Sequence, residues 1–409
     1  MTYPAMNTAP AHRRGGFISQ TVAVAVALAL IAGAWRLAGM GDSTLALSLL
    51  LGAGFGLCLQ RSRFCFFCVT RDFLDHRDAR GLLGIVAALA VGTLGYHLVF
   101  GLFLPDPGGG RLPPDAHIGP VSWVLAVAAL VFGAGMALSG SCISAHLYRL
   151  GEGAVASIIA LIGVLIGFGL GFLSWNHLYL AGIDQAPVLW LPAHLGYGGS
   201  VLVQLSGLGG LAVVLMIGHR RRQPAAPVNE SPDNGGVAQK VLAERWPTYV
   251  GGLLIGALAV AAYLRVAPLG VTAELGSIAR TLGNHAELIP ARLQGLDGFS
   301  GCATIIKAGL LSTNGAFIVG LVMASLAAAL TAGQFGLQPA PVGKSARHLA
   351  GGILMGWGAM TALGCTVGTL LSGIMAAALS GWVFAFFCLA GLWATWRVMG
   401  FLNRASTRG

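Results

Sequence analysis

Ten apolar runs, each long enough to cross a bilayer, follow one another along the chain. They cover 17–35, 44–60, 82–104, 120–140, 154–174, 199–218, 249–267, 314–333, 348–364 and 378–400. About 20 residues of helix cross the roughly 30 Å hydrocarbon core. Because lipid offers the backbone no hydrogen-bond partner, runs of this length must become helices. The sequence therefore predicts an all-α polytopic membrane protein with about 9–10 transmembrane helices.

The composition excludes a soluble domain. Only 9% of the 409 residues are charged, whereas soluble domains carry about a quarter. The net charge of +10 would suggest nucleic acid for a soluble protein, but here the basic residues gather at the ends of the apolar runs. An excess of Lys and Arg in the inner loops explains that placement. We therefore expect a multi-pass membrane protein, with lipid and not nucleic acid around it.

One polar stretch divides the chain. It spans 220–246 and begins with three arginines, followed by a segment rich in Pro, Asn and Gly. Such a composition is typical of a surface linker. We expect a first half at 1–219, with an additional N-terminal helix, and a second half at 247–409. The mixed segment 270–294 is predicted to be an amphipathic or re-entrant helix, not a crossing.

Four cysteines lie in short breaks between apolar runs, each break rich in glycine, serine or arginine. The breaks are 61–65, 139–142, 299–302 and 363–366, with Cys65, Cys142, Cys302 and Cys365. Open backbone at membrane depth is tolerated only where protein covers it or where it lines a cavity. A thiol that recurs in such breaks indicates a passage with sulfur in its lining. Cys58 and Cys388 lie inside apolar runs, where a cysteine is a small packing residue.

The breaks occur in the same order in both halves, as helix, break, two helices, break and helix. On our helix count an odd number of crossings separates equivalent positions, which predicts two halves that are inverted in the membrane. Inverted repeats with broken helices near the midplane are typical of transporters. The expected architecture is thus an inverted-repeat hourglass with short re-entrant helices.

Three kinds of chemistry fit a row of thiols. The Cys65-x-x-Cys68 spacing could serve a soft metal ion or a membrane thiol oxidoreductase. Arginines near the breaks repel a cation, however, and the cysteines of the breaks mostly come singly. The third candidate is a large, soft, sulfur-bearing anion, which a polarizable and weakly hydrogen-bonding thiol suits better than it suits phosphate. The sequence favours this third candidate and leaves the other two open.

Backbone amides and basic side chains would assist an anion. The N–H groups at Gly140, Gly301 and Gly364 lie where the breaks open helix N-termini, and such termini favour anions. Basic residues that could attract an anion are Arg63, Arg149, Arg265, Arg280, Arg292 and Lys307. The last four lie in the outer segment 265–307, where the topology rule disfavours them. Salt bridges to Glu274 or Glu287 are the alternative explanation for the arginines of this segment.

Three segments together resemble the YeeE/YedE family of sulfur-compound transporters. They are 60–65 (Gln-Arg-Ser-Arg-Phe-Cys), 139–142 (Ser-Gly-Ser-Cys) with 148–153 (Tyr-Arg-Leu-Gly-Glu-Gly), and 364–368 (Gly-Cys-Thr-Val-Gly). The resemblance covers roughly 44–400 and implies thiosulfate passed between single cysteines, here Cys65, Cys142 and Cys365. Cys302 would be the fourth position of the repeat. Cys68, the basic linker and the outer segment depart from the family pattern and leave other sulfur or selenium species open as substrates.

The sequence thus predicts a permease and not an enzyme. The substrate would be thiosulfate or a related sulfur-containing anion, imported along a path lined by single thiols. We expect neither a cofactor nor a resident metal ion. A soluble sulfur-carrier protein on the cytoplasmic side is a possible partner.

Overall fold

The computed structural model describes residues 17–220, 244–299, 304–307, 309, 311–339 and 342–406. Its long helices are α1 (Phe17–Gly39), α2 (Ser43–Ser62), α4 (Arg80–Phe103), α5 (Trp123–Ser139), α7 (Val155–Leu178), α8 (Leu191–Arg220), α10 (Thr248–Arg265), α12 (Thr313–Thr331), α13 (Val342–Thr361) and α15 (Leu379–Ser406). Shorter elements are α3 (Phe66–His76), α6 (Ile143–Gly151), η1 (Tyr179–Ile183), α11 (Thr272–His285), η2 (Leu296–Gly298), η3 (Thr366–Ser372) and α14 (Gly373–Met375). Within the described residues only isolated bridges represent β-structure.

The helices confirm the predicted class. Each of the ten apolar runs coincides with a long helix. Nine described helices are long and apolar enough to span a membrane, and the number is ten if the pair Gly343–Thr361 and Thr366–Met375, bent by 46°, is counted as one broken span. The 14 residues of α11 are not among these spans. The protein is an all-α polytopic membrane protein.

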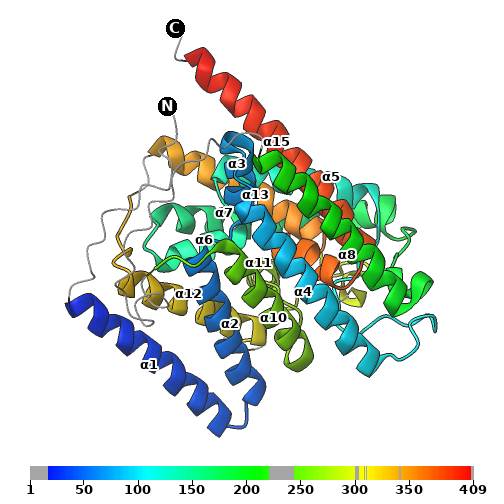
Figure 1. Ribbon diagram of the computed structural model, residues 1–409, viewed down its shortest axis with the longest axis horizontal. Coiled ribbons are helices and arrows are strands. Elements are labelled where there is room, and N and C mark those ends of the chain that lie inside the picture. The colour runs from blue at the N-terminus through cyan, green and yellow to red at the C-terminus, as the bar shows by residue number, and fades with distance from the viewer. Residues whose placement is uncertain are drawn as a thin grey trace.

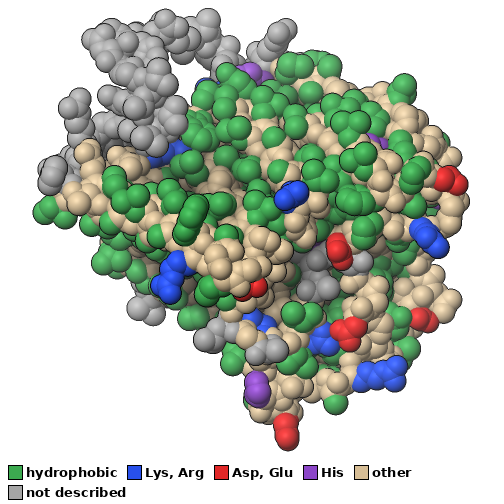
Figure 2. Space-filling view, turned by 90° about the horizontal axis from the view of Figure 1, so that it is seen from below, with side chains coloured by type: hydrophobic (Ala, Val, Ile, Leu, Met, Phe, Trp, Pro, Cys, Tyr) green, Lys and Arg blue, Asp and Glu red, His purple; other side chains and the backbone are tan. Residues whose placement is uncertain are grey.

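The outer surface suits a lipid environment. Large apolar side chains point outward, such as Trp35 on α1 and Leu202 on α8, which are 81% and 68% exposed. Apolar side chains cover much of the face in Figure 2, and charged side chains are sparse there. Helix α1 lies at the edge of the protein, against α2 and α12 (Figure 1). The buried core lies instead where the two halves meet.

The helices of the two halves pack in a pattern that stays the same when the halves are exchanged. Helix α2 packs on α12 as α10 packs on α4, and α7 packs on α13 as α15 packs on α5 (Figure 1). The equivalent helices α5 and α13 run antiparallel, since Gly351 lies against Ser139 while Gly358 lies against Ala128. An inverted repeat requires this arrangement. The inversion itself, and the division at the linker, remain predictions.

Glycines allow these helices to approach until their backbones touch. A Cβ atom on Gly167 of α7 would lie 2.2 Å from the carbonyl oxygen of Ile353 on α13. A Cβ atom on Gly352 of α13 would lie 2.1 Å from the carbonyl oxygen of Ala160. Small residues at such contacts are the usual means of helix association in membranes, because lipid provides no hydrophobic driving force between helices. This packing positions the cysteine breaks.

Candidate functional site

Three cysteine breaks share one local structure, in which the cysteine is the N-cap of the following short element. Cys65 caps α3, Cys142 caps α6 and Cys365 caps η3. Two residues before each cysteine, the preceding helix ends in a left-handed residue. These are Arg63 (φ 54°), Gly140 (φ 76°) and Leu363 (φ 56°). The helix therefore stops, turns and restarts, and the new N-terminus directs its free N–H groups toward the thiol.

The thiols of the first half lie together. The Cys65 and Cys142 sulfur atoms are 3.9 Å apart, and both side chains are fully buried. The backbone N–H of Cys68 donates to the Cys65 sulfur at 3.5 Å, and the Ser144 hydroxyl is 3.3 Å from the Cys142 sulfur. The six described cysteines, among them the additional thiol Cys68, are free thiols. The sequence grouped Cys65 and Cys142 by repeat order only, and the fold brings them into contact.

Arg149 lies near this pair of thiols and contacts a third thiol, that of Cys68. Its guanidinium donates to the Cys68 sulfur at 3.2 Å, and the side chain is half-buried. Because α6 restarts at Cys142, Arg149 lies two helical turns further along the same short helix. Of the basic residues that the sequence nominated, Arg149 is therefore the one in contact with a thiol near the Cys65–Cys142 pair.

Cys365 has a different set of neighbours. The Val367 N–H donates to its sulfur at 3.4 Å, and the Thr272 side chain and the backbone amides of Val271 and Gly368 also hydrogen-bond it. The connection between α4 and α5 lies over this break, with the carbonyl oxygen of His117 beside Gly373. Burial lowers the pKa of His117 to about 4, so its imidazole is neutral near pH 7 and adds no positive charge.

The second half uses α11 where the first half uses α3. Helix α11 follows α10 along the chain as α3 follows α2, and Thr272 at its start contacts Cys365 as Cys65 contacts Cys142. The sequence reasoning missed Thr272, because it sought the repeat through cysteines. Cys302 and Gly301, which it nominated instead, lie outside the described residues, as does most of the linker.

Arg63 belongs to a buried polar network. Its guanidinium is 2.9 Å from the Glu152 carboxylate and also donates to the Gln334 side chain at 3.1 Å. The Gln60 amide donates to both of these acceptors. Glu152 is 7% exposed, so its charge depends on Arg63 for compensation. The network ties the ends of α2, α6 and α12 together.

Arg61 has a structural task at the same end of α12. Its side chain is 1% exposed and donates to the Ala328 carbonyl at 2.8 Å and to the Thr331 hydroxyl at 2.7 Å. Both acceptors lie in the last turn of α12, where a helix carries unpaired carbonyls and a partial negative charge. The arginine therefore caps α12 and is not only a topology signal.

Removing the Glu152 carboxylate should destabilise the protein. Glu152→Ala removes a buried carboxylate that accepts hydrogen bonds from both Arg63 and Gln60, and because the Arg63 side chain is 31% exposed the cost should lie between the roughly 1 kcal/mol of an exposed pair and the roughly 3 kcal/mol of a fully buried one. The melting temperature of the purified protein measures the effect. Asp72→Ala is the control, because Asp72 pairs with Arg71 but its side chain is 44% exposed, and such pairs contribute at most about 1 kcal/mol. Equal shifts for the two variants would contradict the structural importance of the buried pair.

Ion pairs account for two of the nominated residues in the outer segment. Arg280 lies 2.9 Å from Asp297 and also donates to the Thr304 carbonyl. Lys307 pairs with the buried carboxylate of Glu274, which also accepts a hydrogen bond from the Ser312 hydroxyl. Salt bridges to Glu274 or Glu287 were the alternative explanation for the arginines of this segment. Arg280 does form a salt bridge, but with Asp297, and Glu274 pairs with Lys307. The side chains of Arg265 and Arg292 are exposed.

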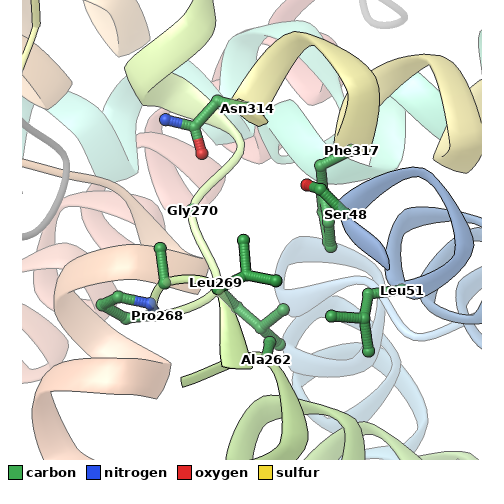
Figure 3. Close-up of a pocket in the computed structure, with 10 residues that line it drawn as sticks. Ser48, Leu51, Ala262, Pro268, Leu269, Gly270, Asn314 and Phe317 are labelled. Carbon is green, nitrogen blue, oxygen red and sulfur yellow. The ribbon is translucent and has the colours of Figure 1, made fainter. Parts of the chain in front are cut away.

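A small pocket lies beside the Cys365 break and not in it. Its lining comes from α2, from the segment around the end of α10, and from α12, and includes Leu51, Leu269 and Phe317 (Figure 3). The Ser48 hydroxyl at its edge donates to the Thr313 carbonyl at 2.7 Å. The lining is mostly apolar and contains neither a cysteine nor a basic residue, so it does not suit an anion. Among the described residues, no three His, Cys, Asp or Glu side chains group as a metal site.

Known proteins are similar to this chain over most of its length. It is 25% identical over 362 residues to the thiosulfate transporter TsuA of Escherichia coli (strain K12), across 86% of this chain and 93% of the relative. It is 29% identical over 354 residues to the thiosulfate transporter TsuA of Spirochaeta thermophila, across 84% and 96%. A probable transporter YedE of Salmonella typhimurium is 29% identical over 184 residues, 44% of this chain and 40% of the relative. A family model described as sulphur transport matches residues 61–394, and the protein therefore belongs to the sulphur transport family.

Proposed function

We propose that this protein is a permease of the bacterial inner membrane that imports thiosulfate, or a closely related sulfur-containing anion, past a series of single cysteine thiols. The observation that carries the proposal is the Cys65–Cys142 pair, two fully buried thiols 3.9 Å apart at the starts of two short helices. The named function of the two relatives that align over most of the chain supports the choice of substrate.

The chemistry of the thiols fits such an anion. Thiosulfate carries its charge on three oxygens and one terminal sulfur. A neutral thiol donates a weak S–H hydrogen bond and is polarizable, so it can face that sulfur without binding it too tightly to release it. The free N–H groups at the start of the following helix point toward the same side as the thiol and stabilise the negative charge of the anion. A site of weak, repeated contacts favours passage over retention, as in channels with several sites.

The proposed order of events assigns the Cys365 break to the outer side and the Cys65 and Cys142 breaks to the inner side. Arg265 and Arg292, whose side chains are exposed, would draw the anion to the outer mouth. Cys365 would receive it, and Cys142 and Cys65 would pass it inward toward Arg149. Cys302 and Gly301 would add a contact on the outer side. Gly140 and Gly364, which have positive φ angles, would let the backbone turn at the breaks. A soluble sulfur-carrier protein would take the anion in the cytoplasm.

Uptake of labelled thiosulfate tests the proposal. In cells that lack other sulfate and thiosulfate importers, expression of the wild-type chain is expected to give saturable ³⁵S-thiosulfate uptake and growth on thiosulfate as the only sulfur source. An excess of unlabelled thiosulfate should abolish the uptake of label, and an equal excess of phosphate should not. Absence of uptake from cells with confirmed membrane expression would refute the proposal.

A thiol oxidoreductase remains the second candidate, because Cys65 and Cys68 start α3 in C-x-x-C spacing and Arg149 contacts Cys68. It would form a Cys65–Cys68 disulfide that cycles with growth conditions. Mass spectrometry of alkylated thiols from quenched cells separates the two functions. Both thiols should be alkylated under all conditions if the protein is a permease.

A further inference from the structure

Three buried threonines lie at or near the break at Cys365. Thr272, Thr366 and Thr369 are 1%, 1% and 6% exposed. In the part of the chain that the structure describes, the hydroxyl oxygens of Thr366 and Thr369 have no hydrogen-bond partner. A buried hydroxyl without a partner is unfavourable, and most native proteins avoid it. Two of them, three positions apart at the start of one short helix, indicate that something outside the chain satisfies them.

One of the three threonines contacts the Cys365 thiol, and the other two lie close to it along the chain. The Thr272 side chain hydrogen-bonds the Cys365 sulfur, and Thr366 follows Cys365 directly along the chain. The Thr369 hydroxyl lies against the backbone that precedes Cys365, since a Cβ atom on Gly364 would be 2.3 Å from it. The start of the 14-residue helix α11, at Thr272, faces the same sulfur. Hydroxyl and N–H donors therefore surround Cys365 on several sides.

The equivalent break of the first half is built differently. There the thiol of Cys65 takes the place of Thr272, and the positions that correspond to Thr366 and Thr369 hold Ile143 and His146. The Cys142 break thus presents two thiols in contact with two buried serines, Ser141 and Ser144, beside them, whereas the Cys365 break presents one thiol with three threonines around it. Thiols are weak donors to soft atoms, whereas hydroxyls form short, strong hydrogen bonds to charged oxygens. The Cys365 break, with more hydroxyls and fewer thiols, is therefore the better suited of the two to the oxygens of an anion.

We propose that the Cys365 break is an oxygen-recognising subsite, in which the hydroxyls of Thr272, Thr366 and Thr369 donate to the oxygens of a sulfonate-like group while Cys365 faces the terminal sulfur of the same anion. This inference rests on the proposed function and adds the basis of selectivity to it. The subsite admits an anion that has both oxygens and a terminal sulfur. The Cys65–Cys142 pair, which offers two thiols in contact, then binds the sulfur end of the anion during release.

Threonine-to-valine variants test the subsite, because valine keeps the shape of the side chain and removes only the hydroxyl. Thr366→Val, Thr369→Val and Thr272→Val are each expected to raise the KM for thiosulfate uptake at least about tenfold, with a smaller change in the maximal rate, since each removes a hydrogen bond to a charged group. Thr366→Ser and Thr272→Ser restore a hydroxyl and should recover most of the affinity. Equilibrium binding of ³⁵S-thiosulfate to the purified variants provides a second measurement that is independent of transport rate.

Thr361→Val is the matched control. Thr361 is 2% exposed on the helix before the break, but its hydroxyl already donates to the Trp357 carbonyl at 2.8 Å, so its loss should leave KM unchanged. Wild-type KM and binding in all three valine variants would overturn the subsite while leaving the proposed function intact. Failure of the wild type itself to take up or bind thiosulfate would overturn both.

Discussion

Replacing Cys142 by alanine should lower thiosulfate uptake by at least about tenfold while leaving the amount of protein in the membrane unchanged. The Cys142 sulfur is in contact with the Cys65 sulfur and lies near the Ser144 hydroxyl, at the start of α6. The substitution removes the thiol that faces the anion at this point, and a tenfold loss of rate requires that this contact lower the barrier to passage by only about 1.4 kcal/mol. Initial rates of ³⁵S-thiosulfate uptake, normalised to membrane expression, measure the loss.

Cys58→Ala is the control for Cys142→Ala. Cys58 is also buried, at 4% exposure, but it lies inside α2 and not in a break. Removing its sulfur creates a small cavity and should leave uptake close to that of the wild type. If Cys142→Ala transported as fast as Cys58→Ala at equal expression, the thiol path would be wrong.

Gly167→Ala should prevent stable folding. The new methyl group would lie 2.2 Å from the Ile353 carbonyl oxygen and 2.8 Å from the Trp357 backbone nitrogen, both on α13. Neither backbone atom can rotate away, so α7 and α13 must separate along the most extensive contact between long helices in the protein. Overpacking with side chains typically costs 1–3 kcal/mol, and we expect at least about 3 kcal/mol here. Thermal unfolding monitored by size-exclusion chromatography should show a melting temperature lower by several degrees or aggregated protein.

Gly169→Ala, two residues further along α7, is the control. A Cβ atom there meets nothing within 4 Å. Alanine is also the better helix former, so this variant should be as stable as the wild type or slightly more stable. Equal melting temperatures for the two alanine variants would show that α7 and α13 do not approach as closely as the structure has them.

The local features of the fold were predictable from the sequence because they depend on neighbouring residues. The length of an apolar run decides whether it crosses a bilayer, and all ten runs became long helices. The breaks were predictable for the same reason. Gly140, for example, supplies the left-handed conformation that ends α5 without steric cost. Arg63 and Leu363 adopt it in the other two breaks although they carry a Cβ atom, which no glycine signal could have indicated.

The partners of charged residues could not be read from local sequence. Arg280 and Lys307 looked like attractors of an anion because they lie where the topology rule disfavours them. In the fold they pair with Asp297 and Glu274, which are 17 and 33 positions away along the chain. Arg61 looked like a topology signal and instead caps α12, more than 260 residues later. Such pairings depend on how distant segments pack.

The sequence by itself determined the membrane-spanning class, the positions of the helices and the breaks that contain cysteine, since apolar length and backbone punctuation act over one or two helical turns. Only the tertiary structure determined which side chains lie in contact at each cysteine break. It brought Cys65 against Cys142 across 77 positions, and it placed Thr272, not a second thiol, against Cys365. The physical reason is that each contact joins segments far apart in the sequence, which are positioned by close helix packing through glycines whose fit to a distant backbone no local pattern encodes.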